Sequence, residues 1–356
     1  MLGYYAHDHG SGHAQFARLI ASATKTVVLT ASTAPLDEAN AVTRLPSDLP
    51  DDHTLDLREF PAPAYAHYAP IGLKTLRARN RLILDSIERH DLSLLIVDVS
   101  VEVAALARLS GVPYAYVRLF GDRSDPPHQF AYAGATFLLA YYPERLESSE
   151  TPDWIREKTL YLGFFSRFDR LTAGQTRQTP DRLITLIRGT GGAHNPPIDF
   201  LNLRRSFPDH RIVSIGSSTP TDSESSSLDV EHLGFLPDPL DLLSRADLVL
   251  AACGAGTVCE LASLQKRFLA IAESRPFDEQ ARFADALASH GLCAVVTTTE
   301  PNLAELAADL RPDWSPHRRP DAPTLFAHWL ARHSSDPRAL LADVRRYRSI
   351  ERLPTA

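Results

Sequence analysis

Long apolar runs are missing from this chain of 356 residues. None approaches the roughly 18 residues that a membrane-spanning helix needs, and the first residues lack the pattern of a signal peptide. An excess of basic residues is missing too, because the formal net charge is -7. Broad binding to nucleic acid needs a basic surface and is therefore not expected. These absences favour a cytoplasmic protein.

Cysteine is scarce, and the three cysteines do not have the spacing of metal ligands. Without an export signal, we expect Cys253, Cys259 and Cys293 to be reduced and buried. Cys253 and Cys259 lie beside a glycine-rich turn, so a reactive thiol is the alternative there.

The length predicts two domains, each large enough to bury its own core. Short apolar runs alternate with helical patterns, which predicts an α/β fold with parallel sheets covered by helices on both faces. Helices are expected after the first strand and over 71–89, 101–109 (capped by Ser100) and 198–207. The expected strands are 2–6, 26–30, 94–97, 114–117, 137–140, 183–187, 211–215, 248–251, 268–271 and 294–296.

Residues 163–180 are polar and lack periodicity, so they are predicted to link the two domains. The first domain would span 1–162 and the second 181–322. Each domain opens with a strand, a glycine-rich turn and a helix. Doubly wound sheets bind ligands beyond the carboxyl ends of their strands, so two such domains would share one cleft. The turn glycines are Gly10 and Gly12 in the first domain, and Gly189, Gly191 and Gly192, beside Thr190, in the second.

The strongest motif follows the expected strand 248–251. Gly254, Gly256 and Thr257 open a helix whose free amides could bind a diphosphate. Glu260 lies further along that helix, where its carboxylate could accept hydrogen bonds from ribose hydroxyls. The alternative is a tight turn followed by a solvated glutamate.

A third polar element stands at the start of a helix expected over 278–289. Asp278, Glu279 and Gln280 could together bind the hydroxyls of a sugar. Ordinary acidic capping of a helix N-terminus is the alternative explanation.

Two residues of the first domain are candidates for catalysis. His13 follows the first glycine-rich turn, and Asp98 comes directly after the expected strand 94–97. His13 could act as a base or steady a developing charge, or it could cap a helix. Asp98 could act in catalysis or belong to a helix cap beside Ser100. No metal is expected, because His7, His9 and His13 do not form a clear ligand set.

The helix over 71–89 carries a run of basic residues. The run could contact an anionic lipid headgroup or an acceptor diphosphate, or it could form a solvated face. Its members are Lys74, Arg77, Arg79 and Arg81.

Residues 230–296 resemble the donor-binding domain of the glycosyltransferases that include the lipid II-forming N-acetylglucosaminyltransferase of peptidoglycan synthesis. The similarity lies in the segments 234–237, 246–249, 253–260 and 278–280, with further matches at 10–13 and 189–192. That family has the GT-B fold, two Rossmann-like domains facing across a cleft. The resemblance implies that helices in 323–356 pack back on the first domain.

The resemblance also implies a role for each matching position. Glu260 would bind the ribose, and the backbone at Phe235 and Leu236 would hold the base, uracil. Thr190, Thr257 and the second-domain glycines would hold the diphosphate. Residues 278–280 would face the donor sugar, and His13 would lie near the reacting centre. Enzymes of this kind invert the anomeric carbon without a metal or other cofactor, because helix N-termini stabilise the leaving diphosphate.

The sequence has departures from the family as well. Arg188 stands where relatives often have glycine, and residues 278–280 contain one glutamine where the peptidoglycan enzyme has a pair. The donor is expected to be a nucleotide-diphosphate sugar and the acceptor stays open, a lipid-linked or cell-envelope glycan being one option. A nucleotide-sugar hydrolase in which His13 activates water, and a binding subunit without catalysis, are the alternatives.

Overall fold

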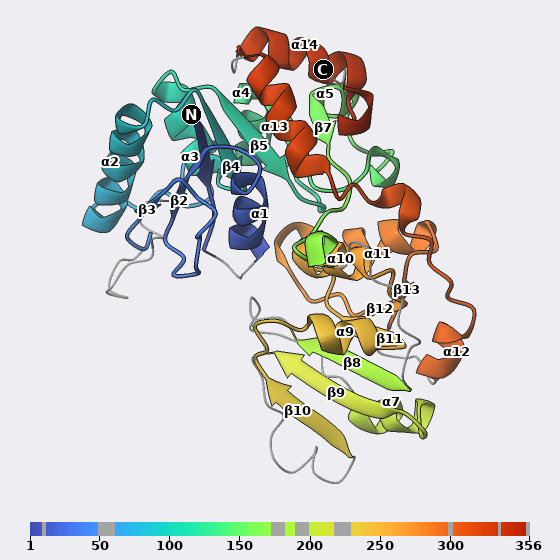
Figure 1. Ribbon diagram of the computed structural model, residues 1–356. Coiled ribbons are helices and arrows are strands. Elements are labelled where there is room, and N and C mark those ends of the chain that lie inside the picture. Colours follow the sequence, from blue (N-terminus) through green and yellow to red (C-terminus); the bar gives the residue numbers. More distant parts are fainter. Residues whose placement is uncertain are drawn as a thin grey trace.

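A computed structural model of the chain describes residues 1–8, 12–48, 61–171, 182–188, 199–216, 229–297, 302–333 and 336–353. These residues form two parallel β-sheets, each covered by helices on both faces (Figure 1). The structure confirms the predicted α/β class with two doubly wound domains. No helix of the described ranges is long and apolar enough to cross a membrane.

The first sheet has the strand order β3-β2-β1-β4-β5-β6-β7. The order reverses between β1 and β4, where Tyr5 is paired with Val97. This reversal is the switch point at which doubly wound sheets bind ligands. The strands are β1 (Leu2–Tyr5), β2 (Thr26–Thr30), β3 (Ala41–Arg44), β4 (Leu94–Asp98), β5 (Tyr114–Arg118), β6 (Phe137–Ala140) and β7 (Thr159–Tyr161).

Alternate residues of the first sheet pack against different helices, as the two-residue period of a strand requires. Tyr4 and Ile96 share a core with α1, α13 and α14, whereas Tyr5 and Val97 share a second core with α2, α3 and α4. The predicted cap is confirmed, since the Ser100 hydroxyl accepts from the Val103 amide at the start of α3. The helices are α1 (Gly12–Ala21), α2 (Lys74–Arg89), α3 (Val101–Leu109), α4 (Pro126–Gly134), α13 (Ala322–Arg332) and α14 (Pro337–Tyr347).

The second sheet has the order β10-β9-β8-β11-β12-β13, with its switch point between β8 and β11. Its strands are β8 (Leu183–Arg188), β9 (Arg211–Gly216), β10 (Val230–Gly234), β11 (Leu248–Ala251), β12 (Phe268–Ala270) and β13 (Ala294–Val295). The helices α9 (Leu240–Arg245), α10 (Ala255–Ser263) and α11 (Glu279–Ser289) cover one face, and α7 (Phe200–Ser206) and α12 (Leu303–Ala308) cover the other.

The two halves share one continuous apolar core. α1 packs against α10, and the Phe16 and Phe165 rings meet edge to face with centroids 5.7 Å apart. The chain passes twice between the halves, where the Phe164 amide donates to the His317 carbonyl at 2.9 Å. α13 then contacts α1, and α14 contacts β6 and β7, so both final helices lie on the first domain (Figure 1).

One member of the predicted basic run departs from the expectation of a ligand-binding or solvated face. Arg79 is buried, with 1% of its surface exposed. Its guanidinium donates to the Tyr5 hydroxyl at 2.6 Å and to the Pro46 carbonyl at 2.5 Å. Lys74, Arg77 and Arg81 are exposed. Arg79 therefore faces inward because β1 and the segment after β3 supply polar acceptors beneath the helix.

Candidate functional site

His13 and Asp98 meet at the switch point of the first sheet. His13 is the second residue of α1 and Asp98 the last residue of β4. The His13 Nδ1 lies 2.9 Å from the Asp98 Oδ2. The Tyr4 hydroxyl donates to the same oxygen at 3.0 Å, and it also lies 3.0 Å from the Tyr141 hydroxyl. The two candidates predicted for catalysis therefore form one pair.

Burial lowers the pKa of His13, but its charged neighbours raise it by more. Among these neighbours, the charge and hydrogen bond of Asp98 raise the pKa the most. The carboxylates of Glu279 and Asp8 add to this effect, so the pKa of His13 is raised overall. Asp98 accepts a hydrogen bond from Nδ1, which places the proton of a neutral ring on that nitrogen. Nε2 is then free to take a proton from a substrate.

The N-termini of α1 and α10 face one another across the domain boundary. A Cβ atom added to Gly256 would lie 3.6 Å from the Gly12 Cα. Gly254 occupies the N-cap of α10 in an extended conformation, and Thr257 is the third residue of the helix. Unpaired amides at helix N-termini attract anions, and two such ends meet here, next to His13 in the first turn of α1. The other predicted phosphate contacts, Gly10, Gly189, Thr190, Gly191 and Gly192, lie outside the described residues.

Glu260 is paired with an arginine from the segment between the domains. The Arg167 Nε donates to the Glu260 Oε1 at 2.8 Å, and its Nη1 donates to the Pro237 carbonyl at 2.9 Å. Burial raises the pKa of Glu260, and the Arg167 charge partly opposes this. Pro237 follows Phe235, which is 66% exposed, and Leu236, which is partly buried. Arg167 thus joins the predicted ribose contact to the residue that follows the two predicted base contacts.

The three polar residues of the predicted sugar contact differ in their surroundings. Asp278 is exposed and Glu279 is partly exposed. Gln280 is buried, and its side-chain oxygen accepts from the Glu273 amide at 2.9 Å. α11 begins at Glu279, one residue later than expected, because Pro276–Asp278 form a 3-10 turn.

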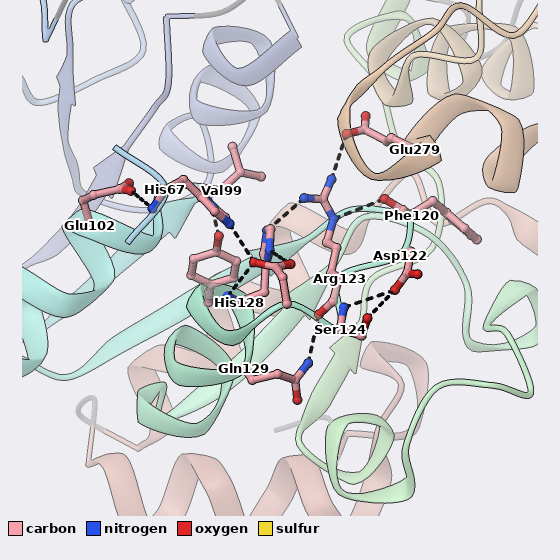
Figure 2. Close-up of polar contacts among 12 residues, drawn as sticks. His67, Val99, Glu102, Phe120, Asp122, Arg123, Ser124, His128, Gln129 and Glu279 are labelled. Carbon is pink, nitrogen blue, oxygen red and sulfur yellow. Dashed lines mark hydrogen bonds and ion pairs between the residues drawn. The ribbon is translucent and has the colours of Figure 1, made fainter. Parts of the chain in front are cut away.

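A polar cluster beside this turn was not anticipated from the sequence (Figure 2). The Asp125 carboxylate lies 2.7 Å from the His67 Nε2 and 2.6 Å from the His128 Nδ1. The Arg123 Nη1 lies 2.9 Å from the His128 Nε2, and its Nη2 donates to the Glu279 Oε2 at 2.8 Å. The cluster therefore runs from the first domain to the start of α11.

Within the part of the chain that the structure describes, one group of residues could hold a metal ion by type and distance. It consists of His67, Asp125 and His128, whose possible ligand atoms lie within 4.8 Å of one another. Arginine only donates hydrogen bonds, so the His128 Nε2 must accept from Arg123. The proton of the neutral ring then lies on Nδ1, the nitrogen that faces Asp125. A metal on Nδ1 would force the proton onto Nε2, opposite the Arg123 donor. This arrangement fits a hydrogen-bonded chain better than a metal centre.

The three cysteines are buried, as expected. Burial raises the pKa of the Cys253 and Cys259 thiols, and it raises that of Cys293 to about 12. Thiolates are the reactive form of cysteine, so the alternative of a reactive thiol beside the glycine-rich turn is not supported.

Sequence reasoning missed Arg123, His128 and Arg167. Asp125 followed by Pro126 is a helix-start signal, and the Asp125 side chain does cap α4. That signal would have placed His128 on the first turn of a helix. Nothing in the sequence would have paired Arg167 with Glu260, because the two residues are brought together only by the packing of two domains.

Comparison with known proteins agrees with this architecture. Residues 210–324 match the glycosyltransferase family 28 C-terminal domain. No curated protein sequence matches the chain significantly.

Among solved structures, the glycotransferase of kitacinnamycin has a TM-score of 0.59 and 15% identity, over 99% of both chains. Acinetobacter baumannii MurG has a TM-score of 0.54 and 14% identity, over 93% of this chain and 99% of its own. The glycosyltransferase SnogD from Streptomyces nogalater has a TM-score of 0.55 and 12% identity, over 98% of this chain and 99% of its own.

The fold is therefore GT-B, and within the second half residues 210–324 match the family 28 C-terminal domain. These findings confirm the resemblance deduced from the sequence, and they support a glycosyltransferase.

Proposed function

We propose that the protein transfers a sugar from a UDP-sugar donor to a hydroxyl group of an acceptor, with inversion at the anomeric carbon. The observation that carries the proposal is the His13–Asp98 pair, with 2.9 Å between Nδ1 and Oδ2, beside the facing N-termini of α1 and α10. A base and an anion-binding surface are the two elements that this reaction requires.

In the proposed step, the acceptor oxygen attacks the anomeric carbon of the donor and forms the new glycosidic bond. The bond from that carbon to the diphosphate breaks, and the nucleoside diphosphate leaves with its electron pair. The hydroxyl proton passes to the His13 Nε2, and Asp98 stabilises the resulting imidazolium. A single displacement of this kind inverts the anomeric configuration. Amides at the α10 N-terminus would stabilise the leaving diphosphate without a metal.

The donor assignment rests on the second domain. Residues 210–324 match a family 28 domain, and Glu260 lies next to the 235–237 segment through Arg167. A carboxylate at this position suits the two vicinal hydroxyls of a ribose, and the resemblance to the peptidoglycan enzyme favours uracil as the base. Asp278 and Glu279 would then face the sugar.

The acceptor is proposed only as a hydroxyl compound presented at an anionic surface. Lys74, Arg77 and Arg81 are exposed on α2, and Ile71 just before it is 63% exposed. Basic side chains beside an exposed apolar residue suit a membrane surface with anionic lipids. Co-sedimentation with vesicles containing or lacking anionic lipid tests this part of the proposal, and equal binding to both would contradict it.

The transfer itself is tested by incubating the protein with a panel of nucleoside-diphosphate sugars and hydroxyl acceptors. We expect UDP release that depends on the acceptor and persists in EDTA. UDP release at the same rate without any acceptor would instead support a nucleotide-sugar hydrolase. Absence of binding to every nucleoside-diphosphate sugar at millimolar concentration would overturn the proposal.

A further inference from the structure

Arg123 is held by the first domain while its guanidinium reaches the second. Its Nε donates to the Phe120 carbonyl at 3.2 Å, and its Nη1 lies 2.9 Å from the His128 Nε2. The remaining terminal nitrogen, Nη2, donates to the Glu279 Oε2 at 2.8 Å. Figure 2 shows Arg123 between His128 and Glu279. All three nitrogens are engaged, so the planar group has a fixed orientation.

His128 is a neutral acceptor for this arginine. Burial and the nearby Arg123 charge lower the pKa of His128, the Asp125 contacts raise it by less, and the result is a pKa of about 4. The ring therefore keeps one proton near neutral pH, on the Nδ1 that faces Asp125 at 2.6 Å. Asp125 also contacts His67, 2.7 Å from its Nε2. The first domain thus orients Arg123 through a chain of hydrogen bonds.

The turn before α11 is strained and is held by the first domain. Phe277 and Asp278 have positive φ angles of 65° and 54°, which residues other than glycine rarely adopt. The Phe277 ring packs against both His128, with centroids 4.8 Å apart, and Arg123, whose Cζ is 5.1 Å from the ring centroid. The Phe277 carbonyl accepts from the Asp122 amide at 2.7 Å.

Gly121 makes this approach feasible. Its φ is +115°, and a Cβ at this position would lie 2.6 Å from the Phe277 carbonyl oxygen. A larger residue would clash with the backbone of the turn. The shape of the turn that begins α11 therefore depends on contact between the domains, and so does the position of Glu279.

We propose that Arg123 is a positioning residue for the donor sugar: it holds one oxygen of Glu279 so that the other faces the sugar hydroxyls when the domains are closed. This role rests on the proposed function, since Glu279 matters only if the site takes a sugar nucleotide. The pair joins the two domains, so recognition of the sugar is coupled to domain closure.

The charges around Glu279 give the role a measurable signature. Burial raises the pKa of Glu279, and Arg123, His13 and Arg275 lower it, Arg123 by the most. His13 comes from α1, Arg123 from the segment before α4, and Arg275 from the segment before the turn. Removal of Arg123 removes the largest influence that lowers the pKa of Glu279, so the pKa rises and Glu279 takes up a proton at higher pH. Sugar binding should then weaken as the pH falls.

The test is isothermal titration calorimetry at pH 8 and pH 6. The two ligands are UDP and a UDP-sugar that the wild-type protein is found to bind. Arg123→Met should weaken UDP-sugar binding about 10–100-fold, as expected for loss of a hydrogen bond to a charged group, and leave UDP binding within about twofold. Its UDP-sugar affinity should fall further at pH 6. Glu279→Gln should reproduce the loss without the pH effect, and the double variant should be no weaker than Glu279→Gln.

Two variants complete the design. Arg123→Lys keeps the charge but not the planar contacts, so it should restore the pH dependence of the wild type and only part of the affinity. Arg282→Met breaks another ion pair between the domains, Arg282–Glu150 at 3.0 Å. It should change the affinity for neither UDP nor the UDP-sugar. Equal losses of UDP and UDP-sugar in Arg123→Met, or no loss of either, would overturn the positioning role alone. A wild type that binds neither ligand would overturn the proposed function and this role with it.

Discussion

The Tyr4 hydroxyl donates a 3.0 Å hydrogen bond to Asp98, on the same oxygen that holds His13. Both Tyr4 and Asp98 are buried. A donor on this oxygen takes up part of the carboxylate charge that would otherwise act on the histidine. Through its hydrogen bond to Asp98, Tyr4 should therefore keep the pKa of His13 lower than it would otherwise be.

The prediction from this contact concerns Tyr4→Phe. The pKa of His13 should rise further, so the acid limb of the rate should move to higher pH, and the plateau should fall less than about tenfold. Tyr114→Phe is the matched control, because its hydroxyl donates to the Ala131 carbonyl at 2.6 Å, away from Asp98. A pH profile that moves equally in both variants would show that general loss of packing is responsible.

The second prediction concerns the base. His13 must be unprotonated to accept a proton, and its pKa is raised, so the rate should fall as the pH drops, with a midpoint above about 6.5. His13→Ala should lower kcat about 10²–10⁴-fold, as general-base loss does, with donor affinity nearly unchanged. Asp98→Asn should reduce the rate and move the acid limb to lower pH, because the charge that raises the pKa is gone. Steady-state rates from pH 5 to 9 check this; if Asp98→Asn abolished transfer and His13→Ala did not, the roles would be reversed.

The third prediction concerns the ribose. Glu260→Ala should weaken UDP binding by about 1.5–3 kcal/mol, the range for a hydrogen bond to a charged group. The loss should be small for a dideoxyribose analogue, which lacks both hydroxyls. Arg167→Met should also weaken UDP binding, and more strongly at pH 6 than at pH 8, since the arginine opposes the effect of burial on the pKa of Glu260. Calorimetry with both nucleotides checks this, and equal losses for the two would remove Glu260 from the ribose site. Glu231→Gln, at an exposed position, is the control.

The sequence was sufficient for those parts of the fold that have a local signal. β2, β6 and β11 begin and end where the apolar runs predicted. β3 and β10 were missed, because they lie at the edges of the two sheets and most of their residues are only partly buried or exposed. β7 was missed because it has three residues, too few to show a period.

The candidate site shows the same limit. His13 and Asp98 follow two strands of predicted type, so their meeting could be anticipated from the rule on strand ends. Arg123 and Glu279 are 156 positions apart in the chain, and neither the packing of the two domains nor the backbone strain at Phe277 leaves a pattern in the sequence. Contacts between domains are therefore the part that required a structure.

The last prediction concerns stability and uses an ion pair away from the site. The side chains of Arg118 and Glu147 are each 7% exposed, with 2.8 Å between Nη1 and Oε2. The hydroxyls of Tyr142 and Tyr161 donate to the same Oε2. Burial raises the pKa of Glu147, but Arg118 and the hydrogen bonds lower it by more, so the pKa is lowered overall. This stabilisation is present above the unfolded pKa of about 4.3 and is lost as the pH falls through the folded value.

Arg118→Met should reduce the free energy of unfolding by about 3–5 kcal/mol at pH 7.5, because a buried carboxylate is left without its partner. Burial then acts with much less opposition, so the pKa of Glu147 lies above its unfolded value and protonation favours the folded state. The deficit should therefore shrink at pH 5, and Arg118→Met combined with Glu147→Gln should recover much of it. Urea unfolding at both pH values measures these differences. The control is Arg211→Met, which breaks the exposed pair with Glu231 and should reduce the free energy of unfolding by less than about 1 kcal/mol. A deficit for Arg118→Met that grew at pH 5 would contradict the assignment of a charged, buried Glu147 side chain.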